Sequence, residues 1–278
     1  MPPTTPPRKQ KRTLLYIALF FFLAGSLLLY SLYMEGYRLT RTLSVARAGT
    51  ITITVPEPRA LVMLDGKIHA RSQNTWDTIV IENVDLGPHT ITVTKDNFHT
   101  WIKTAEILSA DTIAFESVLA PRDLTRYTGS IDAMTAALDA ETVFATNPLP
   151  LPPSPLLSPD RSMEIWTAGK AVEGRWLERA DRLPAFFCAE GALCEKTATI
   201  ASLPTEPRSV SFWSSRSIIV SAGTEVSVTE FDRTGGRNTF TLYRGAAPEH
   251  RSVDTGNGTR RIYIQDAGTI SAFDISYR

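Results

Sequence analysis

The sequence is poor in the residues on which many enzymes and metal sites depend. Its 278 residues include only two cysteines and four histidines. It contains no G-x-S-x-G nucleophile motif, no glycine-rich phosphate loop, no H-E-x-x-H zinc motif and no Rossmann glycine pattern. We therefore expect a protein that is not an enzyme and that needs no cofactor. Carboxylates occur throughout the chain, so a hidden pair for glycoside hydrolysis is the alternative.

The chain also lacks an excess of charge of either sign. It has 29 basic and 29 acidic residues and a formal net charge of zero, whereas a nucleic-acid-binding protein carries a basic patch. We therefore expect no nucleic-acid partner. The one basic cluster lies in the N-terminal tail, residues 1–12, where it indicates membrane topology and contact with anionic lipids. Its members are Arg8, Lys9, Lys11 and Arg12.

Residues 13–33 form a long run without a charged side chain. Twenty or so helical residues span roughly 30 Å, the thickness of the hydrocarbon core of a bilayer. Because the basic cluster precedes this run, we expect a cytoplasmic N-terminus, with residues 34–278 outside the cytoplasm. A cleaved signal peptide is the alternative, but its apolar region typically covers only about 7–15 residues. Near-helical spacing of apolar residues predicts that the helix continues through a juxtamembrane stalk, residues 34–49, to Gly49.

The two cysteines, Cys188 and Cys194, are separated by a short segment that contains Glu190-Gly191. A disulfide across this turn would contribute about 2–3 kcal/mol through loop-closure entropy, and such bonds persist outside the cytosol. Free buried thiols are the alternative. Zinc is disfavoured, because two thiols without a nearby histidine supply only half of a site. We expect the disulfide.

Residues 50–120 are predicted to form strands. Apolar and polar side chains alternate in residues 50–55 and 89–94, and residues 78–84 are expected to form another strand. The dipeptide Asp65-Gly66 is a strong hairpin signal. No stretch of this region has helical periodicity, so we expect a small all-β sandwich.

This series of strands resembles the PEGA domain, a small sandwich of envelope proteins that is similar to carbohydrate-binding modules. The family combines a Pro-Glu-Gly-Ala turn, a hairpin around Asp-Gly-Lys and a strand that follows Gly-x-His. The name-giving turn is degraded here to PEPRA. The resemblance implies a fold and a place in the envelope, and it brings no catalytic residues. The segments that match are residues 56–60, 62–67, 86–93 and 95–101.

Two tryptophans of this region, Trp76 and Trp101, could present flat faces to a sugar ring. In a small sandwich such side chains more often belong to the core. The histidines His69, His89 and His99 could converge on a metal ion, but we expect them to be solvated or at the edge of the core. We therefore predict no metal site.

Residues 121–160 are expected to be a linker. Residues 131–145 are rich in alanine and predict a short helix. Six prolines follow between Pro148 and Pro159, and such a run favours an extended polyproline II conformation. A stiff spacer is the favoured interpretation, and a ligand for an aromatic groove is the alternative.

Residues 161–278 contain strands that recur in pairs. Residues 217–221 pair with 226–232, and residues 261–265 with 270–275, each across a turn that contains glycine. A recurrence after about forty residues is typical of β-propeller blades. The pattern therefore predicts a propeller-like domain.

The segment 209–242 also resembles a propeller-type repeat that follows PEGA domains in membrane-anchored bacterial proteins. The matches lie at Trp213 and at residues 218–220, 230–233 and 235–238. A closed propeller has roughly four to eight blades, and this region is long enough for about two or three. We expect a compact partial propeller. The alternative is completion by other chains, because open strand edges invite pairing.

The densest polar cluster of the chain follows the strand at residues 226–232. Its loop could hold an anion or a sugar. Alternatively, its acidic side chain caps the glycine turn and its asparagine starts the next strand, which is the interpretation that we favour. The cluster consists of Glu230, Asp232, Arg233, Arg237 and Asn238.

These features predict a mainly β, single-pass membrane protein of the bacterial envelope. An N-terminal transmembrane helix would carry a PEGA-like sandwich and a partial β-propeller-like domain. The lipid bilayer would be one partner, and peptidoglycan, another envelope glycan or an envelope protein would be bound by the exported part. The alternative function is a ligand-sensing or hydrolase-type domain displayed on the same anchor.

Overall fold

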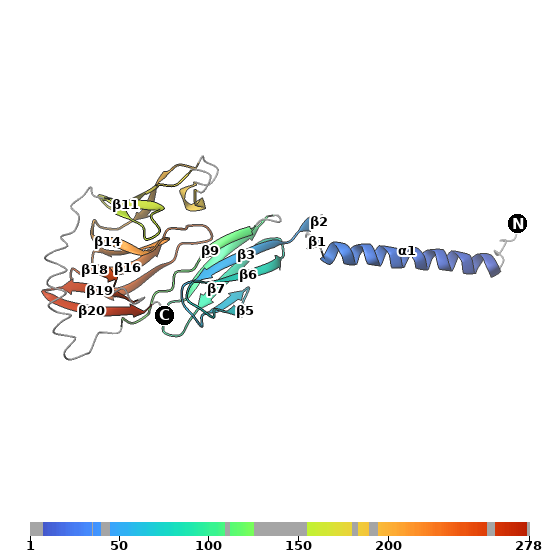
Figure 1. Ribbon diagram of the computed structural model, residues 1–278, viewed down its shortest axis with the longest axis horizontal. Coiled ribbons are helices and arrows are strands. Elements are labelled where there is room, and N and C mark those ends of the chain that lie inside the picture. Colours follow the sequence, from blue (N-terminus) through green and yellow to red (C-terminus); the bar gives the residue numbers. More distant parts are fainter. Residues whose placement is uncertain are drawn as a thin grey trace. The chain divides into compact units, whose positions relative to one another are not determined.

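The computed structural model describes residues 8–34, 36–39, 45–108, 112–124, 155–179, 183–188, 194–254 and 259–276 (Figure 1). In these residues the protein is mainly β, with one long helix near the N-terminus. The chain forms two compact units. The first comprises residues 1–51, 80–87 and 106–113, and the second comprises residues 52–79, 88–105 and 114–278.

The helix α1 extends over Arg8–Met34, and its part from Tyr16 to Met34 is long and apolar enough to cross a membrane. None of this part is buried against the rest of the protein. Its two serine hydroxyls donate to backbone oxygens within the helix, Ser26 to Phe22 and Ser31 to Leu28. These two hydroxyls therefore have partners without water, as a lipid environment requires.

The prediction that the helix continues through residues 34–49 is wrong. The helix ends at Met34, and Gly36 follows with a φ of 83°, a conformation that favours glycine and that ends helices. Strand β1 (Tyr37–Leu39) then pairs antiparallel with β2 (Val45–Arg47). Gly49 begins strand β3 and does not end a helix.

Two sheets follow, with strand orders β6-β3-β9 and β5-β4-β7-β8. Alternate residues of β3 and β8 are buried, as the sequence pattern predicts for strands with one apolar face. The strands are β3 (Gly49–Val55), β4 (Leu61–Leu64), β5 (Lys67–Arg71), β6 (Asp77–Val84), β7 (Gly87–Thr94), β8 (Trp101–Ile107) and β9 (Thr112–Glu116).

The predicted hairpin at Asp65-Gly66 joins β4 to β5, and both residues have positive φ, 50° and 75°. The carboxylate of Asp65 accepts the backbone N–H of Thr90 at 2.8 Å and lies 2.7 Å from Nδ1 of His89. These contacts tie the hairpin turn to β7. They also give His89 a structural partner.

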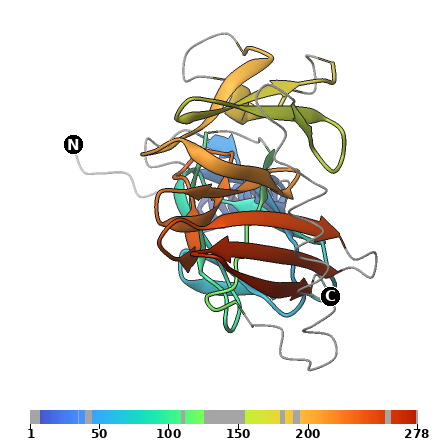
Figure 2. The same cartoon turned by 90° about the vertical axis from the view of Figure 1, so that its left-hand side faces the viewer.

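The C-terminal half contains three antiparallel sheets with strand orders β10-β11-β12-β13, β14-β15-β16-β17 and β18-β19-β20. Figure 2 shows them one beside the next in chain order, from the yellow β10–β13 sheet to the red β18–β20 sheet. Each sheet is open. The strands are β10 (Leu156–Leu157), β11 (Met163–Ala168), β12 (Ala171–Trp176), β13 (Thr197–Ser202), β14 (Pro207–Ser214), β15 (Ser217–Ala222), β16 (Glu225–Glu230), β17 (Thr239–Arg244), β18 (Glu249–Asp254), β19 (Thr259–Asp266) and β20 (Thr269–Ser276).

The first two of these sheets share an apolar core. In β11 and β14 the members of this core alternate along the strand, since one face of each sheet packs against the other. Strand β13 contributes two consecutive residues, Ile200 and Ala201. The 3-10 helix η2 (Ala185–Phe187) adds a phenylalanine to this core. The buried members are Met163, Ile165, Val172, Trp176, Phe187, Ile200, Ala201, Val210, Phe212, Ile218, Val220 and Phe231.

The predicted linker is shorter than its expected range of residues 121–160. Strand β10 pairs with Glu164 and Ile165 of β11, so the end of the proline-rich run belongs to a sheet. β10 itself consists of two leucines, and the neighbouring Pro155 and Pro159 lie outside the strand. The helix expected at residues 131–145 lies outside the described residues.

Candidate functional site

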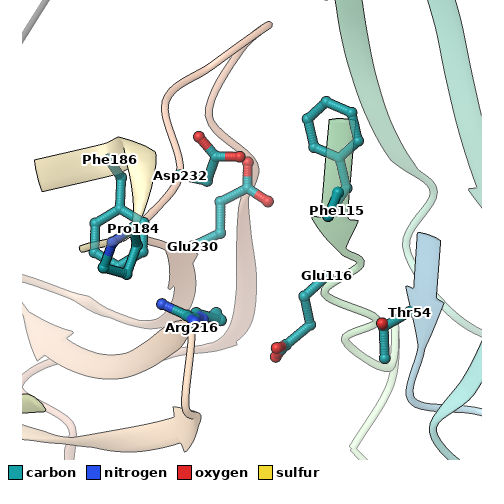
Figure 3. A pocket seen from close by; sticks show the side chains of 9 residues that line it. Thr54, Phe115, Glu116, Pro184, Phe186, Arg216, Glu230 and Asp232 are labelled. Atoms are coloured by element: carbon teal, nitrogen blue, oxygen red, sulfur yellow. The ribbon is translucent and has the colours of Figure 1, made fainter. Parts of the chain in front are cut away.

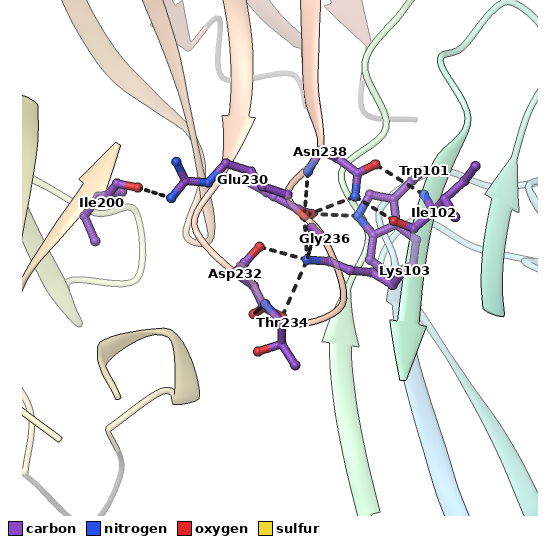
Figure 4. A network of polar contacts seen from close by, with 10 residues as sticks. Trp101, Ile102, Lys103, Ile200, Glu230, Asp232, Thr234, Gly236 and Asn238 are labelled. Atoms are coloured by element: carbon purple, nitrogen blue, oxygen red, sulfur yellow. Dashed lines mark hydrogen bonds and ion pairs between the residues drawn. The ribbon is translucent and has the colours of Figure 1, made fainter. Parts of the chain in front are cut away.

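The predicted polar cluster lies on the loop between β16 and β17, residues 230–238, which we call the polar loop. Lys103 of β8 inserts its ammonium group into this loop (Figure 4). Its Nζ lies 2.6 Å from Oε1 of Glu230 and donates to the backbone oxygens of Asp232, at 2.8 Å, and Gly236. The side chain of Lys103 is completely buried and that of Glu230 is 3% exposed. Because an ammonium group has three protons, these acceptors use all of them.

Both carboxylate oxygens of Glu230 have internal partners. Oε2 accepts the indole N–H of Trp101 at 2.7 Å, and Oε1 also accepts the backbone N–H of Asn238 at 2.8 Å. The amide of Asn238 in turn pairs with the backbone of Ile102, through Nδ2 at 2.9 Å and Oδ1 at 3.3 Å. The carboxylate of Glu230 is therefore held in a buried network of internal partners.

The two arginines of the polar loop contact β13. Arg233 donates to the backbone oxygen of Thr199, and Arg237 donates to that of Ile200 at 2.6 Å. Asp232 accepts the backbone N–H of Thr234 at 2.8 Å, the turn cap that the structural interpretation expects. The five predicted residues therefore lie together, and their contacts join the polar loop to β8 and β13.

The two candidate sugar-binding tryptophans differ in exposure. Trp101 is fully buried, and its ring makes an edge contact with Phe115 at a centroid distance of 6.1 Å. Because its ring has no exposed face, Trp101 cannot stack on a sugar, and it belongs to the hydrophobic core. Trp76 is 47% exposed, and its φ is 57°. Trp76 is thus the aromatic residue of the pair that a ligand can reach.

A cavity of about 330 Å³ lies beside the polar loop (Figure 3). Segments far apart in the sequence contribute to its wall: β3, β9, η2, the β14–β15 turn and the polar loop. We call it the Arg216 cavity. Its lining residues are Thr54, Ala114, Phe115, Glu116, Pro184, Phe186, Arg216, Glu230 and Asp232.

Arg216 lies in the tight turn between β14 and β15, and its backbone oxygen accepts the N–H of Phe231 at 2.9 Å. Its guanidinium carbon lies 5.5 Å from the ring centroid of Trp176 and 5.6 Å from that of Phe186. Nη1 of Arg216 is buried and has no hydrogen-bond partner among the described residues. A buried donor without a partner costs about 1–3 kcal/mol, so this nitrogen is a candidate ligand contact.

Glu116 extends from the end of β9 toward the side of the cavity on which Arg216 lies (Figure 3). Its Oε1 accepts the hydroxyl of Ser214 at 2.9 Å. Burial raises the pKa of Glu116, while the Ser214 hydrogen bond and the charge of Arg216 oppose this shift. The carboxyl group is therefore shifted toward its protonated form, in which it can donate a hydrogen bond.

The structure contains the disulfide between Cys188 and Cys194. Cys188 directly follows η2, the short helix that supplies Phe186 to the cavity wall. The disulfide therefore fixes the chain next to that wall.

The described parts of the chain contain no group of three or more His, Cys, Asp or Glu side chains that could hold a metal ion. His69 lies on the exposed edge strand β5, and His89 contacts Asp65. The ring of His99 stacks on Phe240 at a centroid distance of 5.2 Å. The three histidines have different surroundings and do not form one site.

The sequence analysis did not single out Arg216, Glu116 or Phe186. Each belongs to a short turn or a strand end, and no motif joins them, because the cavity arises only when five separate segments meet. No protein-family model matches this chain, and no curated protein matches it either. The function is therefore inferred from the geometry of the polar loop and the Arg216 cavity.

Proposed function

We propose that this protein is a membrane-anchored binding protein that displays its β-sheets outside the cytoplasm. The helix that is long and apolar enough to span a bilayer supports the anchor. The basic tail before it supports a cytoplasmic N-terminus. The Cys188–Cys194 disulfide supports an oxidising surrounding for the sheets.

The observation that carries the binding role is the unpaired Nη1 of Arg216 at the wall of a cavity. The guanidinium group lies over two aromatic rings, which favour its position before a ligand arrives. Preorganised polar groups in an apolar concavity are typical of small-ligand sites. Glu230, one of three carboxylates in the cavity, is committed to Lys103 and Trp101, which leaves Glu116 and Asp232 as the pair that the hydrolase alternative would use.

We further propose that strands β3–β9 form a PEGA-like sandwich and that β10–β20 form a partial propeller of three blade-like sheets. The partly buried pair of Glu57 and Lys95, 2.6 Å apart, supports the first assignment, because it joins the degraded PEPRA turn to the Lys of the later family segment. Sheets of three or four antiparallel strands in chain order support the second. Three blades do not close a ring, so the propeller would be partial.

The test of the proposed function uses the full chain. A C-terminal epitope tag in intact cells should be removed by added protease, since residues 34–278 would lie outside. The purified chain in detergent is then screened by thermal shift against small acids, amines, zwitterions, sugars and nucleotides. We expect at least one compound to raise the Tm of the wild type and not that of Arg216→Gln. A protected tag contradicts the topology, and shifts that are equal in both proteins contradict the binding site.

The half-exposed ring of Trp76 favours a second candidate function, binding of envelope glycan. The full chain in detergent is mixed with purified peptidoglycan and sedimented. We expect Trp76→Ala to lose sedimentation and Ile68→Ala, which removes another exposed apolar side chain, to retain it. Equal sedimentation of the two variants would show that Trp76 does not contribute to glycan binding.

A further inference from the structure

We propose that the Arg216 cavity binds a zwitterion of the amino-acid class, with the carboxylate of the ligand on Arg216 and its ammonium group on Asp232. This inference rests on the proposed binding function and specifies its ligand. Figure 3 shows both residues in the wall of the same cavity, with Glu230 between them and the ring of Phe115 across from them in this view.

The site for the carboxylate follows from the surroundings of Arg216. The guanidinium carbon lies over the rings of Trp176 and Phe186, at 5.5 and 5.6 Å from their centroids, and these ring faces attract the cation without accepting a strong hydrogen bond from it. Nη1 is buried without a partner among the residues that the structure describes. A planar guanidinium edge is complementary to a carboxylate, with which it forms two parallel hydrogen bonds.

The site for the ammonium group follows from the hydrogen bonds of Lys103. Its three protons go to Glu230, to the backbone oxygen of Asp232 and to that of Gly236. The side-chain Oδ2 of Asp232, at 4.0 Å, receives none of them. The side chain of Asp232 is 30% exposed and lines the cavity, so a ligand cation can approach its carboxylate.

The balance of charges favours a ligand that carries both signs. The single charge of Lys103 faces two carboxylates, Glu230 at 2.6 Å and Asp232 at 4.0 Å. Arg216 is the other cation of the cavity, with Glu116 beside it. A ligand with only a carboxylate would face Asp232 without compensation, and an amine would leave Arg216 unpaired. The rings of Phe115 and Phe186 offer an apolar wall to the hydrocarbon part of a zwitterion.

The experiment measures binding to the full chain in detergent by calorimetry and ligand-observed NMR. Three zwitterions with different charge separations serve as probes: phenylalanine, 4-aminobutyrate and 6-aminohexanoate. Each is compared with its deaminated and its decarboxylated counterpart. We expect at least one zwitterion to bind about tenfold or more tighter than both of its counterparts, since each charged hydrogen bond contributes at least that factor.

Two variants test which residue binds each charged end of the ligand. Arg216→Gln should lower the affinity for the zwitterion to the affinity for its amine counterpart. The affinity for that amine should not change. Asp232→Asn should lower the affinity for the zwitterion to the affinity for its carboxylate counterpart. This variant keeps the hydrogen bond that caps the turn, because Asn retains Oδ1. Arg175→Gln, on an exposed side chain outside the cavity, is the matched control and should bind like the wild type. Unchanged Tm values show that the variants are folded, and Arg216→Lys replaces Arg216→Gln if the latter is not.

The inference is overturned if a carboxylate or an amine binds as tightly as its zwitterion, or if no probe binds. In either case the compound screen decides the proposed function separately. If a sugar, nucleotide or simple acid raises the Tm of the wild type and not that of Arg216→Gln, the cavity is a binding site for a ligand of another class. If no compound in the screen raises the Tm of the wild type alone, both the binding function and the zwitterionic ligand are contradicted.

Discussion

The Nζ of Lys103 and Oε1 of Glu230 form a buried ion pair at 2.6 Å between β8 and the polar loop. Further hydrogen bonds from Trp101 and Asn238 satisfy the carboxylate. We call this network the Lys103–Glu230 clamp. It joins a strand from the first half of the chain to a loop from the second, and the Arg216 cavity lies beside it.

Removal of the lysine should destabilise the protein strongly. Lys103→Met leaves the carboxylate of Glu230 buried without its counter-charge, which typically costs about 3–5 kcal/mol. Urea unfolding of the full chain in detergent measures the change. Arg244→Met is the control, because Arg244 pairs with Glu225 at 75% and 40% exposure, and an exposed pair contributes about 1 kcal/mol or less. Similar losses in the two variants would contradict a special contribution of the clamp.

A methyl group at Gly235 should be far less tolerated than one at Gly223. The two residues have similar φ values, 65° and 56°, so alanine brings the same backbone strain of about 1 kcal/mol at each. A Cβ at Gly235 would collide with the carbonyl oxygen of Thr104, whereas one at Gly223 meets its nearest atom at an ordinary 3.6 Å. We expect Gly235→Ala to lose about 1–3 kcal/mol more than Gly223→Ala in the same urea titration. Equal losses would show that the polar loop is not held closely against β8.

His250 should make the protein sensitive to acid. Burial, reinforced by the charge of Arg251, lowers its pKa to about 3, and its ring nitrogens contact the hydroxyls of Ser209, Ser211 and Ser221. Above pH 6.5 the ring is neutral in both the folded and unfolded states, so it adds no pH dependence. Between about pH 6.5 and pH 3 only the unfolded state binds the proton, and the free energy of unfolding falls as the pH falls.

The contribution of His250 over that interval is on the order of a few kcal/mol. Urea titrations at several pH values should show a shallower acid slope for His250→Gln than for the wild type. The slopes are compared, and not the stabilities at neutral pH, because the substitution also changes the packing. Identical slopes would mean that His250 is protonated in the folded state as readily as in the unfolded state.

Reduction of the Cys188–Cys194 disulfide should lower the stability by about 2 kcal/mol, the loop-closure contribution of a short ring. The measurement is the Tm of the full chain in detergent with and without a thiol reductant. A Cys188→Ser, Cys194→Ser double variant should have the Tm of the reduced wild type and should not respond to reductant. Because Cys188 adjoins η2, any ligand of the Arg216 cavity should also bind more weakly after reduction.

The sequence was informative where local pattern determines structure. Alternation located the strands, and Asp65-Gly66 located a hairpin, because both signals depend on neighbouring residues. It misled where one residue overrides a pattern: the leucine spacing after Met34 favoured a helix, yet Gly36 ends it. The five residues of the polar cluster were identified, but not their partner Lys103, since nothing in the sequence relates β8 to the polar loop. The cavity was missed for the same reason.

The Lys103–Glu230 clamp also has a consequence for folding kinetics. Trp101 and Glu230 are 129 positions apart in the chain, and contacts of such long sequence separation form late, after local strand pairs have formed. We expect Lys103→Met to raise the unfolding rate in stopped-flow experiments and to leave the refolding rate almost unchanged, because interactions absent from the transition state act mainly on unfolding. A slower refolding rate would place the clamp in the nucleus. The buried pair thus controls how long the native state persists, and the hairpins control how quickly it is reached.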